Sequence, residues 1–338
     1  MKIKEEISLK PYNTFNISAN ARYYTELEST ENIYEFIHEK KFQNIPQLIL
    51  GGGSNILLTG NFDGIVLKNQ LMGVRLIQET PEHYFIKASA GENWHRFVLY
   101  CIENNYAGLE NLSLIPGCVG ASPMQNIGAY GVEVKDLIHE VETIHLGSGQ
   151  TQVFDNPSCK FDYRSSVFKT SYKNQFIITS VIFKLNKKPN YTITYGSIEE
   201  ELDKMGIKEL SIRAISDAVC RIRKSKLPNP SEIGNAGSFF KNPVVPIKIA
   251  EELKEHYPDI PIYTVNPTNC KLAAGWLIEK CGWKGKTIKN CGVHTKQALV
   301  LVNYGNASGK DILELANRII ASVKDTFHVE LEKEVNII

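Results

Sequence analysis

The chain has 338 residues, of which 43% are hydrophobic and 22% are charged, and its formal net charge is +1. This near-neutral balance argues against a broad surface for nucleic acid or anionic membrane, because both need a concentrated positive field. The composition is that of a soluble globular protein, and the length predicts two or three domains. We therefore expect neither a nucleic-acid partner nor a membrane partner.

Residues 111–132 contain no charged side chain and are about as long as a membrane span of roughly 20 residues. Prolines and glycines interrupt the stretch, so hydrocarbon would leave its backbone unsatisfied, and we interpret it as a loop-rich binding segment. The N-terminal residues lack the apolar core of a signal peptide, which predicts a cytoplasmic protein.

The seven cysteines form no CxxC pair, and the eight histidines show no HxH or HExxH spacing. We expect reduced, mostly buried cysteines and no bound metal.

Patterning in the first half of the chain alternates between helix and strand. Thr30 is the expected N-cap of a short helix, and residues 46–50 form a strand that leads into a glycine run. A second strand follows at 64–67. Further along, 92–105 has one apolar helical face, and 176–183 is rich in the β-branched and aromatic residues of a strand.

The second half begins with an amphipathic helix at 211–226, which ends before Pro228 and Pro230. Three helices should follow, near 247–256, 272–281 and 309–326, the last with Ser308 as its N-cap. Residues 329–338 alternate between apolar and polar side chains, as in a half-buried strand.

The first candidate site is the run from Gly51 to Asn55, with the sequence GGGSN, directly after a predicted strand. Consecutive glycines can turn their N–H groups into one concavity and let a diphosphate approach the backbone. The run is not a Rossmann fingerprint, because the third glycine of GxGxxG would fall at Ile56, where a strand is predicted. Taken alone, the motif fits a plain glycine turn equally well.

The second candidate is the stretch 116–131, in which glycines and prolines alternate with Ser122, Gln125 and Asn126. Such a loop suits a polar ligand that needs backbone donors. A structureless linker fits less well, because linkers seldom carry so many apolar residues.

Other features are weak when each is taken alone. The basic residues that end helix 211–226 suit the helix dipole by about 0.3–1 kcal/mol and need no ligand. Gly285-Lys286-Thr287 imitates a Walker loop, but Lys280 stands where its first glycine should be. Ser238 lacks the GxSxG spacing of a hydrolase nucleophile. A lone arginine such as Arg164 is more often a surface charge than a catalyst.

Together, these segments are far more specific, and the chain resembles the type I form of the UDP-N-acetylenolpyruvoylglucosamine reductase (MurB) family over essentially its whole length. Tyr195-Gly196 matches the loop that distinguishes this form. The segments that carry the resemblance are, in order, GGGSN, AGENWHRFVLY, GLENLSLIPGCVGASPMQNIGAYGVE, FDYRSSVFK, TYG, KLPNP, GNAGSFFKNPVV, KLAAGWLIEKCG, HTKQALVLVN and LEKEV.

The resemblance implies an α+β fold of three domains, with FAD bound between the first two in the non-Rossmann, vanillyl-alcohol-oxidase-like (PCMH) arrangement. The implied bounds are 1–70 plus 329–338 for the first FAD-binding domain, 71–218 for the second and 219–328 for an α+β substrate-binding domain. The implied flavin contacts are Gly51, Gly52, Gly53, Ser54, Asn55, Pro116, Gly117, Gly120, Ser122, Asn126 and Gly128.

The resemblance also implies the reaction, in which NADPH reduces FAD and FAD then reduces an enolpyruvyl UDP-sugar to UDP-N-acetylmuramate for peptidoglycan and the cell wall. Hydride addition leaves negative charge beside a carboxylate, which calls for preorganised donors and one acid. By similarity, Arg164 orients the carboxylate, Glu334 assists while protonated or sharing a proton, and Ser238 delivers the proton.

By the same similarity, Tyr195 and Lys226 hold the substrate diphosphate, and Asn242 and Gln297 lie near the UDP moiety. Binding roles are also implied for Tyr163 and Arg223. One departure is visible, because Lys333 stands where the common pattern has proline, which affects the expected pose of Glu334.

Two alternatives stay open from the sequence. A related FAD oxidase acting on another substrate would share the flavin loops without needing Ser238, Arg164 and Glu334 together. A sugar-nucleotide binder without catalytic activity would carry no flavin colour. We expect the protein to be a monomer.

Overall fold

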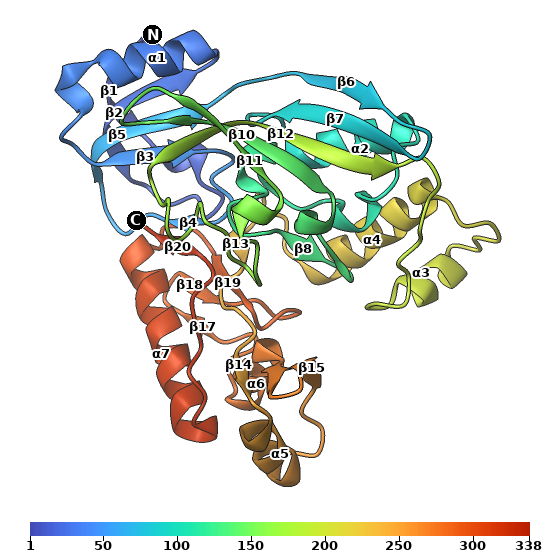
Figure 1. Ribbon diagram of the computed structural model, residues 1–338. Helices are drawn as coiled ribbons and strands as arrows, with labels where there is room; N and C mark the ends of the chain where they lie inside the picture. The colour runs from blue at the N-terminus through green and yellow to red at the C-terminus, as the bar shows by residue number, and fades with distance from the viewer. The chain divides into compact units, whose positions relative to one another are not determined.

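The computed structural model describes residues 1–338 and divides into two compact units, each built from separate stretches of the chain (Figure 1). Unit 1 contains Met1–Ile7, Ala21–Gly52 and Asp63–Ser225. Unit 2 contains Ser8–Asn20, Gly53–Phe62 and Lys226–Ile338. The division into three domains stays a prediction.

The first sheet of unit 1 has four strands in the order β1-β2-β5-β3. These are β1 (Lys4–Ser8), β2 (Asn20–Leu27), β5 (Phe62–Asn69) and β3 (Gln47–Leu50), with β3 parallel to β5. Helix α1 (Thr30–His38) buries Ile33 and Phe36 in the same core as Ile65 and Leu67 of β5. Both strands expected here are confirmed, and β5 is longer than expected.

The N-cap of α1 is Ser29, so the expected cap at Thr30 was wrong by one residue. Ser29 has extended backbone angles, and its hydroxyl accepts a hydrogen bond from the Asn32 N–H at 3.4 Å. Adjacent hydroxyl residues are equivalent in sequence, and only the backbone conformation decides which one caps the helix.

The second sheet of unit 1 is antiparallel, with the order β11-β10-β12-β7-β6. Its strands are β6 (Val74–Glu79), β7 (His83–Ser89), β10 (Ile138–His145), β11 (Thr151–Asp155) and β12 (Phe176–Asn186). Helix α2 (Trp94–Glu103) is capped by Asn93 and buries Trp94 and Phe97 against Phe183 of the central strand. This confirms the expected helix and strand.

Between α2 and β10 the chain contains only short elements. They are three 3-10 turns at Glu110–Leu112, Val119–Ala121 and Val134–Asp136, and the two-stranded ladder of β8 (Gly128–Ala129) and β9 (Val132–Glu133). The Trp94 indole N–H donates to the Leu112 carbonyl at 2.9 Å. The loop is therefore packed onto the core of unit 1, unlike a linker.

Helices α3 (Ile198–Lys204) and α4 (Ile212–Lys226) share a separate apolar cluster. The inward positions expected for α4 are confirmed, because Ile212, Ile215, Val219 and Ile222 are all buried.

Unit 2 contains a four-stranded antiparallel sheet, a three-stranded one and three helices. The strand order of the first sheet is β13 (Gly234–Ser238), β19 (Val300–Asn303), β18 (Cys291–Val293) and β17 (Thr287–Ile288). The strand order of the second sheet is β14 (Val244–Pro246), β16 (Asn269–Leu272) and β15 (Ile262–Asn266). The helices are α5 (Ile247–His256), α6 (Ala274–Lys280) and α7 (Gly309–Phe327), close to the expected bounds. No helix in either unit has the length and apolarity needed to cross a bilayer.

The C-terminal segment is a strand only at β20 (Asn336–Ile337), which pairs in parallel with β4 (Ile56–Leu57). The strand expected over 329–338 was therefore wrong for most of its length, and Ile337 is 37% exposed instead of inward. The reason is that residues 332–334 pair with 239–241, whereas 336–337 pair with 56–57. Because the segment changes its pairing partner between residues 334 and 336, one alternating pattern of side chains does not describe its whole length.

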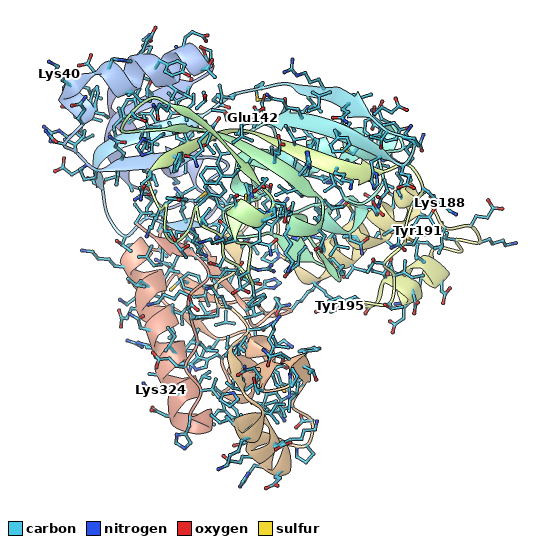
Figure 2. All side chains as sticks on the ribbon, in the orientation of Figure 1. Lys40, Glu142, Lys188, Tyr191, Tyr195 and Lys324 are labelled. Atoms are coloured by element: carbon cyan, nitrogen blue, oxygen red, sulfur yellow. The ribbon has the colours of Figure 1, made fainter.

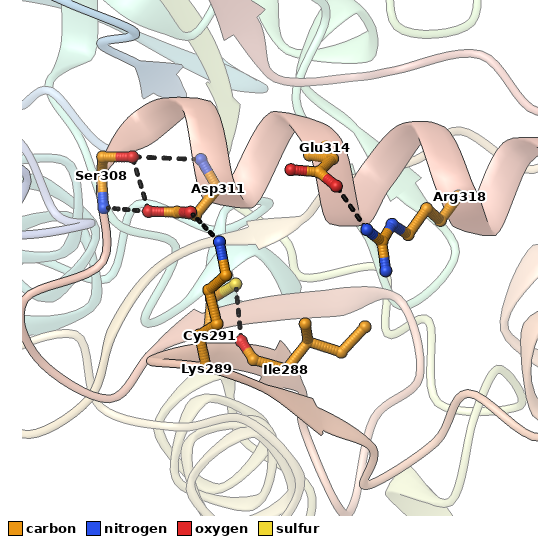
Figure 3. A network of polar contacts seen from close by, with 7 residues as sticks. All are labelled: Ile288, Lys289, Cys291, Ser308, Asp311, Glu314 and Arg318. Carbon is orange, nitrogen blue, oxygen red and sulfur yellow. Dashed lines mark hydrogen bonds and ion pairs between the residues drawn. The ribbon is translucent and has the colours of Figure 1, made fainter.

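Ser308 begins α7 with a reciprocal capping box, as expected (Figure 3). Its hydroxyl accepts from the Asp311 N–H at 3.2 Å, while the Asp311 carboxylate accepts from the Ser308 N–H at 3.0 Å. Lys289 reaches the same carboxylate at 3.5 Å from the strand side. Two of the N–H groups at the start of α7 are thereby satisfied within the chain.

We predict that Ser308→Ala lowers the free energy of unfolding by about 0.5–2 kcal/mol, because Asp311 and Ser308 lose their mutual hydrogen bonds. Urea denaturation followed by circular dichroism measures the change. Ser308→Thr should keep most of the stability. Ser322→Ala, inside the same helix, should change it by less than about 0.5 kcal/mol. Equal losses at both serines would contradict the capping role.

Candidate functional site

The glycine run meets the loop 116–131 backbone to backbone within unit 1. A Cβ atom at Gly52 would lie 2.8 Å from the Cα of Gly117, and one at Gly120 would lie 2.5 Å from the Cβ of Ala90. Real Cβ atoms do not come so close, so only glycine allows these approaches. The amide N–H groups of Gly52 and Gly117 have no acceptor in the protein. We call the group formed by Gly51, Gly52, Gly117, Gly120 and Gly128 the glycine cradle.

Ser122 and Asn126 shape this loop from inside. The Ser122 hydroxyl donates to the Val119 carbonyl at 2.7 Å. The Asn126 side chain, which is 0% exposed, donates to the Asp162 carbonyl at 3.1 Å and accepts from the Lys135 N–H at 3.0 Å. Their side chains therefore hold the loop's conformation, and their contact with flavin stays a prediction.

Arg164 lies at the tip of a tight hairpin closed by two hydrogen bonds of 3.1 Å between Asp162 and Ser165. Its backbone has a φ of 53°, an uncommon conformation for a residue other than glycine. The guanidinium donates to the Gly128 carbonyl at 2.9 Å and lies 5.5 Å from the ring of Tyr163. Arg164 is therefore a cation fixed against the 116–131 loop, and its catalytic role stays a prediction.

Tyr195 lies on the loop before α3 and packs against the end of the 116–131 loop (Figure 2). A Cβ atom at Gly131 would be 3.1 Å from that of Tyr195, and one at Gly196 would be 3.4 Å from the ring of Tyr130. Tyr195 nevertheless stays 54% exposed. Its phenol is therefore accessible to a ligand, while its backbone is fixed by close packing.

The four basic residues at the end of α4 differ in their surroundings. Arg221, Lys224 and Lys226 are exposed, whereas Arg223 is partly buried and donates to the Leu114 carbonyl at 3.3 Å. Burial lowers the pKa of Arg223 and raises that of Tyr130, whose hydroxyl interacts with this guanidinium. The expectation of a uniformly solvated basic patch was therefore wrong for Arg223.

His95 of α2 also faces this cluster. Its Nδ1 accepts a hydrogen bond from the Leu114 N–H at 3.0 Å, so the neutral ring carries its proton on Nε2. Burial lowers its pKa, and the charges of Lys224 and Arg223 lower it further. His95 and Tyr130 were not predicted from the sequence to lie at the site, because only the loop motifs around them indicated one.

In unit 2, Ser238 ends β13 opposite Val300, and Glu334 lies on the segment that pairs with the next residues. The Glu334 N–H donates to the Phe239 carbonyl at 2.8 Å, and its own carbonyl accepts from the Asn55 amide at 3.4 Å. Backbone pairing thus fixes Glu334 one residue away from Ser238 across the ladder.

Lys333 takes the place of the usual proline without disturbing this pairing. The bridge between Phe240 and Lys333 uses the Lys241 N–H to the Glu332 carbonyl at 2.9 Å and the Glu334 N–H to the Phe239 carbonyl. Neither bond uses the N–H of residue 333, which proline would lack. Proline at this position would therefore remove neither hydrogen bond of the bridge.

Asn242 and Gln297 each lie beside the start of α6. The Asn242 side chain accepts from the Ala274 N–H at 3.0 Å. The Gln297 oxygen would lie 3.4 Å from a Cβ at Gly275. Two residues far apart in sequence are thus brought to one helix end.

The predicted site residues are divided between the two units. Unit 1 holds Tyr163, Arg164, Tyr195 and Arg223 together with the cradle glycines Gly51, Gly52, Gly117, Gly120 and Gly128. Unit 2 holds Gly53, Ser54, Asn55, Lys226, Ser238, Asn242, Gln297 and Glu334.

Two family models match the chain, an FAD binding domain over residues 21–155 and the C-terminal domain of UDP-N-acetylenolpyruvoylglucosamine reductase over 229–338. The reductase of Amoebophilus asiaticus is 48% identical, with 100% of each chain covered. That of Flavobacterium johnsoniae is 47% identical, also with 100% of each chain covered.

Two solved structures share the fold. The MurB reductase of Thermus caldophilus aligns with a TM-score of 0.69 and 24% identity over 100% of this chain and 99% of its own. A 4-ethylphenol oxidase from Gulosibacter chungangensis aligns with a TM-score of 0.50 and 12% identity over 90% and 80% of the two chains. These likenesses confirm the expected α+β flavoprotein fold.

FAD is the cofactor that the matched domain binds, and the glycine cradle fits it. A diphosphate needs close backbone approach and amide donors that the protein leaves without acceptors, and Gly52 and Gly117 offer both. The failure of the Rossmann pattern agrees with this non-helical arrangement.

We predict that Gly52→Ala abolishes or strongly weakens FAD retention, because the new methyl group collides with Gly117. Gly60→Ala is the control, since nothing lies within 4 Å of the Cβ that it would add. Flavin absorbance relative to protein absorbance in the purified holoenzyme measures retention. A colourless Gly60→Ala beside a yellow Gly52→Ala would contradict this account of the cradle.

Proposed function

This chain belongs to the UDP-N-acetylenolpyruvoylglucosamine reductase family, and we propose that it catalyses the NADPH-dependent, FAD-mediated reduction of UDP-N-acetyl-3-O-(1-carboxyvinyl)-glucosamine to UDP-N-acetylmuramate. The observation that carries the proposal is 48% identity to a reductase of that name over the full length of both chains. The chain is an oxidoreductase and a flavoprotein. The proposed product is a peptidoglycan precursor, so the proposed role is in cell-wall synthesis.

FAD, when bound, supplies a carrier that accepts hydride from one substrate and gives it to another. The protein has to stabilise the charge that appears on the sugar nucleotide. Hydride addition to the enolpyruvyl double bond places negative charge on the carbon beside a carboxylate, and water alone stabilises that charge poorly. Fixed donors lower this barrier, because they need no reorganisation at the moment of reaction.

The proposal assigns the substrate carboxylate to Arg164, with help from Glu334. The hydrogen bond from Arg164 to Gly128 and the closed hairpin support this role, since they fix the cation before substrate arrives. Glu334 must be protonated or share a proton to assist a dianion.

Ser238 is the proposed proton donor. A hydroxyl is a weak acid, but the carbanion-like intermediate is a strong base, so the transfer becomes favourable when it is needed. Ser238 is partly exposed, and it follows Gly237, whose φ of 69° turns the chain just before the strand ends. This geometry supports an accessible hydroxyl on a rigid strand end.

We assign the substrate diphosphate to Tyr195 and Lys226, the UDP moiety to Asn242 and Gln297, and further binding contacts to Tyr163 and Arg223. The exposure of Tyr195 and Lys226 and the position of Asn242 and Gln297 beside the start of α6 support these roles. The proposal keeps three domains, and pairing of β20 with β4 supports the return of the last residues to the first domain.

We predict that NADPH bleaches the flavin under anaerobic conditions and that the enolpyruvyl sugar nucleotide restores its colour. Stopped-flow absorbance separates the two half-reactions. If the sugar nucleotide leaves the flavin reduced while oxygen restores it rapidly, the chain is an oxidase with another substrate and the reductase proposal fails.

We further predict that Ser238→Ala leaves flavin reduction by NADPH nearly unchanged and slows reoxidation by the sugar nucleotide by about 10²–10⁴. The methyl group keeps the strand but removes the only proton that the hydroxyl could give. The exposed Ser231→Ala serves as control and should match wild type in both half-reactions. Equal slowing of both half-reactions in Ser238→Ala would show that the serine acts elsewhere.

A further inference from the structure

Lys68 is a half-buried charged residue that directly follows four buried residues of β5. Ile65 and Leu67 of β5 point into the core beneath α1, so the alternation of side chains sends Lys68 to the opposite face of the sheet. The parallel register aligns Lys68 with Leu50 at the end of β3. The two adjacent strands can be followed in Figure 1. Lys68 thereby lies beside the first residue of the glycine run.

The Lys68 ammonium donates a hydrogen bond to the carbonyl of Gly51. A trans peptide places its C=O and its N–H on opposite sides. Holding the Gly51 carbonyl toward β5 therefore turns the N–H of Gly52 away from β5. This is the N–H that has no acceptor in the protein and that adjoins Gly117 in the cradle.

The charge of Lys68 is not neutralised by a neighbouring carboxylate. No ion pair forms at its ammonium, and the nearby Glu26 already accepts from the Tyr24 hydroxyl at 2.9 Å and lies 3.9 Å from Lys4. Burial lowers the pKa of Lys68, and only the field of the Cys118 thiol and of Glu26 opposes this. A partly buried cation of this kind gains from a nearby anion.

We propose that Lys68 is a cofactor-positioning residue, which orients the first peptide of the glycine cradle toward the diphosphate of FAD and places a positive charge behind that peptide. The inference rests on FAD binding and not on the identity of the reduced substrate. The amides of Gly52 and Gly117 then form the anion site, as in other phosphate-binding nests, and Lys68 holds the first of them from the carbonyl side of its peptide.

The test is the affinity of the full-length protein for FAD, followed by flavin fluorescence on dilution of the holoenzyme. Lys68→Met should raise the dissociation constant about 10- to 100-fold, the range expected for a lost charged hydrogen bond. Lys68→Gln keeps a donor without the charge and should fall between, whereas Lys68→Arg should restore most of the affinity. Lys184→Met removes an exposed lysine of the same unit and should change nothing.

Two further readouts separate an electrostatic role from a merely structural one. Raising KCl from about 0.05 to 0.5 M should weaken FAD binding more in wild type than in Lys68→Met. ADP, which carries the diphosphate without the flavin ring, should lose affinity by the same factor as FAD. Unchanged FAD affinity in Lys68→Met, or a loss for FAD with none for ADP, would overturn the proposal whether or not the reductase assignment holds.

Discussion

The contact between Gly52 and Gly117 is the constraint on which the cofactor site depends. Strands β4 to β7 and helix α2 separate the two loops in sequence. The loops nevertheless approach so closely that one added methyl group would collide with the backbone. The end of β3 positions the first loop, and hydrogen bonds inside the 116–131 loop fix the conformation of the second. The amides left without acceptors are the result, and they suit an anionic ligand.

A second principle is that backbone pairing fixes the two residues for which we propose catalytic roles in binding the substrate carboxylate. The hairpin from Asp162 to Ser165 fixes Arg164, and the ladder between 239–241 and 332–334 fixes Glu334. Such pairing is insensitive to most side-chain changes. The backbone of each residue is therefore fixed by pairing, and the Arg164 guanidinium is held in addition by its hydrogen bond to the Gly128 carbonyl.

All helices except α3 could be predicted from the sequence because their periodicity was regular, as in α2, α4 and α7, whereas most strands were not predicted apart from β3, β4, β5 and β12. The fold and the cofactor were predicted from several motifs that occur in one order along the chain. Pattern alone failed where the chain changes partners, as at Ile337, and where two neighbours could fill one role, as at Ser29 and Thr30. The inward turn of Arg223 and the contacts of His95 and Tyr130 depend on residues distant in sequence, which no local pattern reports.

Position 333 shows how a sequence signature differs from the structure that it describes. Because the ladder uses only the amides on either side, the backbone places no demand for an N–H on this residue. Proline and lysine are then interchangeable for pairing, although they are chemically unlike. A search that insists on proline would reject this chain, whereas one that asks which amides are engaged would accept it. Motifs for such tails are better written as donor and acceptor positions than as letters.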